Sequence, residues 1–418
     1  MDWKTFSIAE EYIELDSKVM DICSQVFNYI EEVRDYNQLK VLNAFREVGI
    51  GTHHLNGTTG YGYNDVGRDA LDRVFAKSVE AEDSLCRTQF MSGTHAITVA
   101  LFGILRKNMH ILSVTGTPYD TLHTTLGLSG KGQGSLTEYG IEYEQIDLKD
   151  GKPDLEAIVE RVRSVDVVYI QRSSGYSVRE VLTLEDIEHI STVSKRENKN
   201  VIVVVDNCYG EFTNTKEPVS HGADLIIGSL IKNPGGGIAE TGGYIAGKKD
   251  LVELCANRLT APGVGREIGS NPLGYRNTYL GLYLAPMITS EALKSATYAS
   301  CFFGLLGFET SPSIESTRND IITRIKLNTK ENLNMLCRAI QSSSPVDSHA
   351  VPTASDMPGY DSKVIMASGS FTAGSSIELS GDAPLKEPYY AFVQGGLNLI
   401  ASRYAFLKAA MLLFKETK

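Results

Sequence analysis

The stretch Ala223–Gly247, "ADLIIGSLIKNPGGGIAETGGYIAG", decides the fold. Its first half is an apolar run that ends on Lys232, and a proline and three glycines follow almost at once. Proline and glycine break regular structure, so the chain must turn sharply after the lysine, before the apolar "GGYIAG" begins a further strand. Such a turn either holds the amine inside a pocket or leaves an ordinary solvated charge at a strand end.

Apolar runs of the same kind alternate with amphipathic segments upstream. Strands that are apolar on both faces and separated by helices are typical of a mostly parallel sheet covered on both sides. In such sheets ligands gather at the carboxyl ends of the strands. We expect strands at 109–116, 141–148, 165–173, 200–212, 223–232 and 241–248, and helices at 93–107, 119–127, 154–163 (capped by Asp154) and 184–198.

The flanking regions have a different pattern. Residues 5–48 show helical spacing, and a glycine- and aromatic-rich loop, 51–67, follows. Loops of that length are usually functional. Helical patterns return at 279–306 and 319–343, before strand-like pieces at 362–371 and 375–381. We therefore expect an N-terminal helical segment (1–50), a large α/β domain (51–285) and a smaller C-terminal α/β domain (286–418).

Composition narrows the class of protein. The 418 residues are 42% hydrophobic and 22% charged, and the net charge of −11 disfavours nucleic acid or an anionic membrane as a partner. No secretory signal or membrane-length apolar run is visible. The six cysteines lack CxxC pairs and the eight histidines lack ligand spacing. We expect a cytoplasmic protein with reduced thiols and no metal.

Two features in the first third of the chain suggest a cofactor site. Ser92, Gly93 and Thr94 begin a helix, where free amides and a hydroxyl can bind phosphate. The alternative is an ordinary helix cap. Tyr119 follows a proline turn and could stack on a ring, or it could pack in the core.

Asp206 and Lys232 complete the pattern. Asp206 follows five β-branched residues, so its carboxylate is expected to be buried beside a cation, although loop amides could also satisfy it. A buried Lys232 would have a lowered pKa and could form a Schiff base, whereas a snorkelling lysine is the alternative. Together, a phosphate-binding helix start, an aromatic residue, a strand-end aspartate and a lysine predict a pyridoxal phosphate site.

Motifs spread over nearly the whole chain carry a family resemblance. The sequence resembles the fold type I pyridoxal-phosphate enzymes (aspartate aminotransferase-like) of cysteine and methionine metabolism. Within them it is similar to the methionine γ-lyase-like, or cystathionine β-lyase, branch linked to aluminum resistance. The motifs are "TTGYGYNDVGRD" (58–69), "SGTHAI" (92–97), "GTPYDTL" (116–122), "IQRSSGYSVR" (170–179), "VVDNCYGEF" (204–212), "GSLIKNPGGGIAETGGYIAG" (228–247), "GLYLAPMITSEALK" (281–294) and "GDAPLKEPYYAFVQGGLNLI" (381–400).

The resemblance implies a fold and roles for individual residues. The fold would be a three-layer α/β/α large domain with a mostly parallel sheet. Lys232 would carry the cofactor, Asp206 would pair with its ring nitrogen, and Tyr119 would stack on the ring and assist as an acid. The phosphate would be held by Ser92, Gly93, Thr94 and Ser229. A neighbouring subunit's phosphate would be reached by Tyr63 and Arg68, in a homo-oligomer (a dimer of dimers) with shared active sites.

Two departures from the family pattern concern the substrate. Ile231 stands where better-known γ-lyases have a threonine, and Glu378 stands where they have an arginine for the substrate carboxylate. A glutamate cannot bind a carboxylate, so another cation must do so. We favour Arg172 for its place at a strand end and Lys386 second. Arg179 and Arg403 are further candidates.

The implied reaction is carbon–sulfur lysis of a small sulfur-containing amino acid of the cystathionine, cysteine or methionine type. It would proceed by α-proton abstraction followed by β- or γ-elimination. Two alternatives stay open. One is another carbanion reaction on the same cofactor, by an aminotransferase, aldolase or synthase. The other is a catalytically inactive, cofactor-binding regulatory protein.

Overall fold

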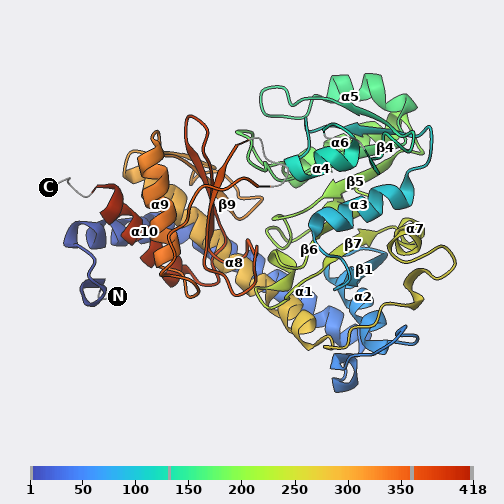
Figure 1. Ribbon diagram of the computed structural model, residues 1–418, viewed down its shortest axis with the longest axis horizontal. Coiled ribbons are helices and arrows are strands. Elements are labelled where there is room, and N and C mark those ends of the chain that lie inside the picture. The colour runs from blue at the N-terminus through green and yellow to red at the C-terminus, as the bar shows by residue number, and fades with distance from the viewer. Residues whose placement is uncertain (1–2, 130–132, 358–361, 415–418) are drawn as a thin grey trace. The chain divides into compact units, whose positions relative to one another are not determined.

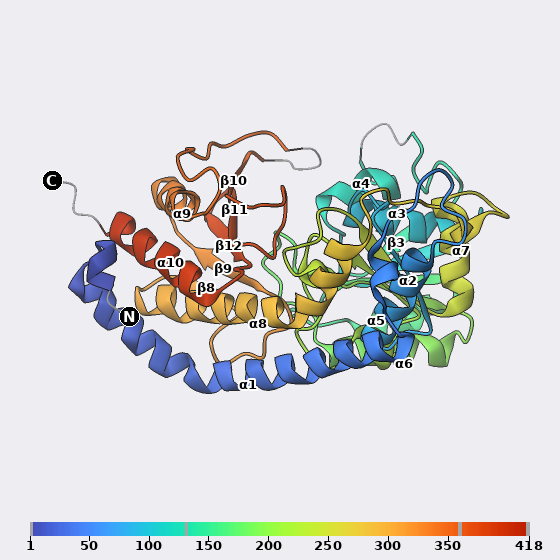
Figure 2. The same ribbon diagram turned by 90° about the horizontal axis from the view of Figure 1, so that it is seen from below.

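The computed structural model describes residues 3–129, 133–357 and 362–414, and the statements below concern these residues. The chain forms two compact units, a large unit (Asn37–Leu284) and a small unit (Met1–Tyr36 with Ala285–Lys418). Helices α1 (Glu10–Val48) and α8 (Arg276–Leu305) each belong to both units, and Figure 2 shows each as one unbroken helix. The first 36 residues thus group with the C-terminal part, and the domain limits expected above stay a prediction.

The large unit is built on a mostly parallel sheet with the strand order β1-β7-β6-β5-β4-β2-β3 (Figure 1). β7 runs antiparallel to both of its neighbours, β1 and β6. Every residue of β4, β6 and β7 is buried, as expected for strands covered on both faces. The strands are β1 (Asp83–Arg87), β2 (His110–Ser113), β3 (Glu142–Gln145), β4 (Val167–Gln171), β5 (Ile202–Asp206), β6 (Leu225–Ser229) and β7 (Gly243–Gly247).

The register of the central strands brings their carboxyl ends together. Gln171 pairs with Asp206 across β4 and β5, and Asp206 pairs with Ile227 across β5 and β6. Ser229 lies two residues further along β6. The side chains that follow these strands are therefore neighbours at one edge of the sheet, as expected.

Helices cover the sheet and begin at recognisable caps. The side chains of α3 and α7 share one hydrophobic core with the strands. Asp154 caps α5 as predicted, because its carboxylate accepts the amide of Ala157. The helices are α2 (Val66–Ser78), α3 (Gly93–Ile104), α4 (Asp120–Leu126), α5 (Leu155–Arg161), α6 (Leu184–Glu197) and α7 (Lys249–Leu259).

Several elements of the large unit were not expected from the sequence, among them β1, α2 and α7. β1 is short and polar at its start, so it has no apolar run. The region read as a loop over 51–67 contains a short 3₁₀ turn, Thr52–Leu55, and ends at α2, which Asp65 caps by accepting the amide of Arg68.

The small unit contains an antiparallel sheet with the order β10-β11-β12-β9-β8. The helical reading of 319–343 was wrong for its first part, where β9 forms and pairs with β12. Ile322 and Ile325 are three residues apart and Leu327 follows two later, so the apolar spacing fits either period and the tertiary pairing decided between them. The elements are β8 (Glu309–Ser311), β9 (Ile322–Lys326), α9 (Lys330–Ser342), β10 (Val364–Ser368), β11 (Ser380–Pro384), β12 (Tyr390–Gln394) and α10 (Leu399–Leu413).

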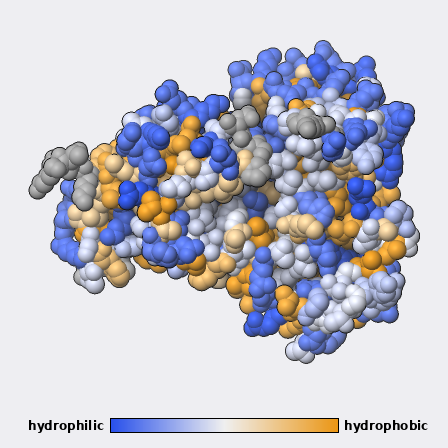
Figure 3. All heavy atoms as spheres, viewed as in Figure 1, coloured by the Kyte–Doolittle hydropathy of each residue, from blue (hydrophilic) through white to orange (hydrophobic). Residues whose placement is uncertain are grey.

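Polar side chains cover much of the outside of the large unit. Figure 3 shows hydrophilic residues over the end of the large unit that contains α5, consistent with a helix that buries one side only. Among the described residues, no helix is both long enough and apolar enough to span a membrane.

Candidate active site

The turn after β6 holds Lys232 in place. A side chain at Gly235 would put its Cβ 1.7 Å from the carbonyl oxygen of Leu230, so this close return of the chain requires glycine. Gly236 follows in the left-handed region at φ 55°. The lysine Nζ lies 3.8 Å from the centre of the Tyr209 ring. Lys232 is thus half-buried and held against the neighbouring loop, and its place in a cofactor pocket stays a prediction.

The electrostatics of Lys232 differ from the expectation. Burial lowers its pKa, but the acidic groups of Tyr209, Cys208 and Glu211 raise it more. The net result is a pKa above the ordinary value for lysine. A lowered pKa would require these neighbours to be neutral or distant, and the sequence does not show that the loop after β5 places them here.

Asp206 ends β5 and is 3% exposed. Its Oδ1 accepts the amide of Cys208 at 3.1 Å. Burial raises the pKa of Asp206, whereas Cys208 and the positive charges of Lys232 and Arg179 lower it in part. Both interpretations of Asp206, a neighbouring cation and loop amides, therefore apply, because the Cys208 amide and the charge of Lys232 stabilise the same carboxylate.

The start of α3 forms a small cradle. Ser92 caps the helix by accepting the amide of His95 at 3.1 Å, so the amides of Gly93 and Thr94 precede the first internal hydrogen bonds. A Cβ at Gly93 would lie 3.3 Å from Cβ of Ser229 and 3.5 Å from Sγ of Cys208. The predicted phosphate residues from α3 and β6 therefore lie side by side, and Gly93 faces Ser229 of β6 and Cys208 of the loop after β5.

Tyr119 joins the same region from the start of α4. Its hydroxyl lies 2.8 Å from Oγ1 of Thr94, and its amide donates to Oε1 of Gln171 at 2.7 Å. Burial and the charge of Asp206 raise its pKa, so the phenol keeps its proton at neutral pH. Gln171 positions Tyr119, a role that the sequence alone did not suggest.

The loop after Asp206 has a buried scaffold that the sequence reading also missed. Asn207 donates to Glu217 at 2.9 Å and accepts from Arg172 at 2.8 Å. Asn233, next to the lysine, donates to the carbonyls of Tyr209 and Glu211, both at 3.0 Å. The sequence does contain one sign of this scaffold, the polar run "DNCYGE" that directly follows a buried strand.

Comparison with known proteins identifies the group to which this chain belongs. The profile of the methionine gamma-lyase family matches residues 12–413. YnbB of Bacillus subtilis is 43% identical over 92% of this chain and 91% of its own length. A crystal structure from Clostridium novyi, of a carbon–sulfur lyase involved in aluminum resistance, is 47% identical. It covers 98% of this chain and 97% of its own, with a TM-score of 0.93.

The chain belongs to the methionine gamma-lyase family. The more distant pyridoxal-5'-phosphate-dependent protein YhfS from Escherichia coli shares the fold, with a TM-score of 0.61 at 14% identity over 91% of this chain and 97% of its own. The predicted fold type I architecture is therefore confirmed, and the protein is a pyridoxal-phosphate-dependent lyase.

The residues of this chain fit the cofactor that the family implies. A phosphate has the capped amides at the start of α3 with Ser229 beside them, and the ring has Tyr119 at the start of α4 and Asp206 at the end of β5. Lys232 follows the next strand, and its charge acts on Asp206. These contacts are consistent with the predicted roles, which stay predictions for each residue.

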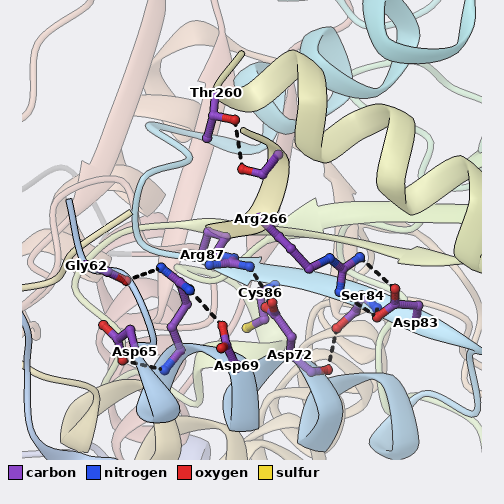
Figure 4. A network of polar contacts seen from close by, with 12 residues as sticks. Gly62, Asp65, Asp69, Asp72, Asp83, Ser84, Cys86, Arg87, Thr260 and Arg266 are labelled. Carbon is purple, nitrogen blue, oxygen red and sulfur yellow. Dashed lines mark hydrogen bonds and ion pairs between the residues drawn. The ribbon is translucent and has the colours of Figure 1, made fainter. Parts of the chain in front are cut away.

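The two residues expected to reach a second subunit differ in their surroundings. Tyr63 is 61% exposed. Arg68 is 1% exposed and donates to the carbonyl of Gly62 at 2.8 Å and to Asp69 at 2.9 Å. Figure 4 shows Gly62 and Asp69 within a longer network that contains the pairs Arg87–Asp72 and Arg266–Asp83. Arg68 therefore holds its own loop, and its role toward another chain stays a prediction.

The residues considered for binding the substrate carboxylate differ in their exposure and in their existing partners. Arg172 is 1% exposed and donates to Asn207 and to Gly210, which disfavours it as a substrate ligand. Lys386 is exposed in a turn of the small unit. Arg403 is paired with Asp16. Arg179 is half-buried, donates to the carbonyl of Gln171 at 2.7 Å and acts electrostatically on Asp206.

The structure shows what Glu378 does at the position where an arginine was expected. It precedes β11, whereas the sequence reading put it in a strand. It is 3% exposed, and its two oxygens accept the amides of Phe371 at 2.8 Å and Thr372 at 3.0 Å. The carboxylate thus closes the loop before β11 by satisfying two amides.

Proposed function

We propose that this protein is a carbon–sulfur lyase that cleaves a sulfur-containing amino acid of the cystathionine, cysteine or methionine type. One observation carries the proposal. Asp206 ends β5 and Lys232 follows the neighbouring strand β6, so the positive charge of the amine acts on the carboxylate of Asp206 beside the α3 cradle. Membership of the methionine gamma-lyase family and the name of the Clostridium novyi structure support sulfur chemistry.

Each residue would contribute a defined step. Bound pyridoxal phosphate supplies an electron sink for the pair left on the substrate α-carbon. Asp206, as a carboxylate, would stabilise positive charge on the ring nitrogen. Lys232 would hold the cofactor and, once its amine is free, take the α-proton. Tyr119 keeps its proton and could donate it to the departing sulfur.

The first experiment tests the lysine. The purified protein is incubated with pyridoxal phosphate, reduced with borohydride and digested, and the modified peptide is identified by mass spectrometry. We expect the label on Lys232 and none after Lys232→Ala, while Lys199→Ala, an exposed lysine, leaves the label in place. Labelling of another lysine would refute the assignment.

The second experiment tests the reaction. The loaded protein is given cystathionine, cysteine or methionine, and thiol and 2-oxo acid are assayed. We expect both products from at least one substrate, and neither from the Lys232→Ala variant. A 2-oxo acid without thiol would favour an aminotransferase. An absorbance band that never responds to amino acids would favour a cofactor-binding protein without catalysis.

A further inference from the structure

Three hydroxyl groups form a chain of hydrogen bonds at the starts of α3 and α4. The hydroxyl of Tyr119 lies 2.8 Å from Oγ1 of Thr94, and Oγ1 of Thr94 lies 3.2 Å from Oγ1 of Thr121. Thr94 is the second residue of α3, and Thr121 is the second residue of α4. The proposed mechanism uses the phenol of Tyr119, but it gives the Thr121 hydroxyl no task and assigns Thr94 to the phosphate.

The side chain of Tyr119 is fixed at both ends. Its amide donates to Oε1 of Gln171 at 2.7 Å, and its ring packs against the hydrophobic core that α3 shares with the sheet. Its hydroxyl lies at a normal O–H···O distance from Oγ1 of Thr94. The phenol oxygen therefore has a defined place, and the direction of its hydrogen bond with Thr94 decides where its proton points.

That direction follows from the task of Tyr119. A hydroxyl donates one proton and accepts through two lone pairs. If Tyr119 donated to Thr94, its proton would not reach a departing sulfur. If Thr94 donates to Tyr119, the phenol proton is free, and Thr121 must then donate to Thr94. One arrangement, from Thr121 to Thr94 to Tyr119, thus leaves the phenol proton available to a substrate.

The surroundings of Tyr119 make such donors important. Burial raises the pKa of Tyr119, and hydrogen bonds from Thr94 and Thr121 lower it in part. A buried phenolate close to a carboxylate is unfavourable unless donors face its oxygen. The titratable groups that interact with the phenol are Asp206, Cys208 and Tyr169.

We propose that Thr94 and Thr121 are positioning residues that direct the proton of Tyr119 toward the substrate, an inference that rests on the proposed lyase function. When the carbon–sulfur bond breaks, the sulfur keeps the electron pair. The O–H bond of Tyr119 then breaks as an S–H bond forms, and the two threonines stabilise the phenolate that is left. A proton from water restores the phenol. The amide of Thr94, rather than its hydroxyl, would then serve the phosphate.

The first test reads Tyr119 directly, without cofactor or substrate. A ring-fluorinated tyrosine, whose phenol ionises at lower pH, is inserted at position 119 of the full chain, and fluorine NMR follows its ionisation as the pH rises. Thr94→Val keeps the shape of the threonine and removes the donor. We expect it to raise the ionisation midpoint by about one pH unit, because the phenolate loses a hydrogen bond.

A conservative variant and a matched control accompany this test. Thr94→Ser keeps a hydroxyl in place, and its midpoint should stay within about 0.3 unit of the parent. Thr121→Val should raise the midpoint by about half a unit, since Thr121 acts through Thr94. Thr124→Val, at an exposed threonine one turn further along α4, is the control and should leave the midpoint unchanged.

The second test compares turnover with cofactor binding. We expect Thr94→Val to lower kcat for thiol release about tenfold and to change KM by less than about twofold, because the threonine acts on a proton and not on substrate binding. Its affinity for pyridoxal phosphate should stay within about threefold of the parent. Ser229→Ala, which removes a hydroxyl predicted to bind the phosphate, should weaken that affinity about tenfold.

Two outcomes would overturn the inference. One is a folded Thr94→Val protein whose midpoint stays within about 0.3 unit of the parent. The other is a loss of cofactor affinity of about tenfold or more in that variant, which would assign the Thr94 hydroxyl to the phosphate. If Thr94→Val does not fold, an unchanged midpoint in Thr121→Val decides against the inference. Failure of the proposed function is separate, because it shows as a parent protein that releases no thiol from any of the three substrates.

Discussion

At the residue scale, the site depends on which polar groups are already used by the protein. Arg172 and Glu378 both attracted attention in the sequence, and both are engaged in holding buried loops. Arg179 also donates to carbonyls of its own loop, those of Gln171, Ser173 and Glu180, but it is only half-buried and its charge acts on Asp206. These tertiary contacts therefore change which residue is the best candidate for binding the substrate carboxylate.

We predict that Arg179 binds the substrate carboxylate. A guanidinium can bind a carboxylate through two parallel hydrogen bonds, which a leucine cannot replace. Arg179→Leu should raise KM about tenfold or more in the lyase assay, with a smaller change in kcat. Arg196→Leu, an exposed arginine on α6, is the control and should leave KM unchanged. An unaltered KM in Arg179→Leu would contradict the assignment.

Glu378 should matter for stability. Glu378→Ala leaves the part-buried amide contacts of Phe371 and Thr372 without their acceptor, and we expect a loss of about 1–3 kcal/mol of unfolding free energy in urea. Glu309→Ala, in an exposed pair with Lys326, should cost less than about 1 kcal/mol. A stable Glu378→Ala protein with a strongly raised KM would instead assign the residue to the substrate.

At the element scale, a change at the start of α3 should affect cofactor binding more than it affects folding. Its first turn contains Gly93, where the space beside the backbone is bounded by Ser229 and Cys208. A methyl group there would occupy the region proposed for the phosphate. The helix propensity of alanine is higher than that of glycine, which offsets part of the strain from a Cβ that would lie 3.3 Å from Cβ of Ser229.

We predict that Gly93→Ala weakens pyridoxal phosphate binding about tenfold or more and lowers the melting temperature of the cofactor-free protein only slightly. Fluorescence titration with pyridoxal phosphate measures the first quantity and thermal unfolding the second. Gly304→Ala near the end of α8, where a Cβ meets only Thr310 at 3.7 Å, should leave the affinity unchanged. Unchanged affinity in Gly93→Ala would place the phosphate elsewhere.

At the scale of the whole molecule, buried carboxyl groups make stability depend on pH. Burial raises the pKa of Asp72 to about 6 and that of Glu211 from 4.5 to about 8. In both cases the folded-state pKa lies above the unfolded value. The native state therefore binds extra protons within that window, and its stability falls as pH rises through it.

We predict that the unfolding free energy falls between about pH 4.5 and pH 8, by a few kcal/mol from Glu211 alone. Urea unfolding of the cofactor-free chain at a series of pH values measures it. Glu211→Gln should flatten the profile in the upper half of this range and Asp72→Asn in the lower half. A profile that rises with pH in the parent would show that these groups are not protonated in the native state.

We propose that the chain assembles into a homo-oligomer through an aromatic loop. The carbonyl of Tyr61 accepts the amide of Gly269, and the carbonyl of Gly60 accepts from Ser270, which joins the loop to the segment before α8. Apolar side chains are exposed around this junction, namely Tyr61 (72%), Tyr63 (61%), Val66 (52%), Met91 (85%) and Leu273 (87%). Contiguous exposed apolar groups mark interaction surfaces.

Light scattering should give a mass of two or four chains, and Leu273→Glu should reduce it. Val351→Glu, at an exposed apolar residue of the small unit, is the control and should not change the mass. A monomeric parent protein would refute the assembly and leave Tyr63 without a partner subunit.

The sequence by itself determined the parallel sheet, most of its strands and helices, and the residues gathered at their carboxyl ends. These follow from local patterns, because a strand buried on both faces is apolar throughout and a turn after it needs proline and glycine. Ser92, Gly93, Thr94, Tyr119, Asp206, Ser229 and Lys232 could be named because each follows or begins such an element.

Only the tertiary structure decided the pKa values of these site residues and which further side chains lie beside them. It placed Thr121 beside Thr94, buried Arg68 and Arg172 against their own loops, and made β9 a strand by pairing it with β12. These outcomes depend on contacts between residues far apart in the chain. The pKa of a lysine and the availability of an arginine are set by such neighbours, and a local pattern does not contain them.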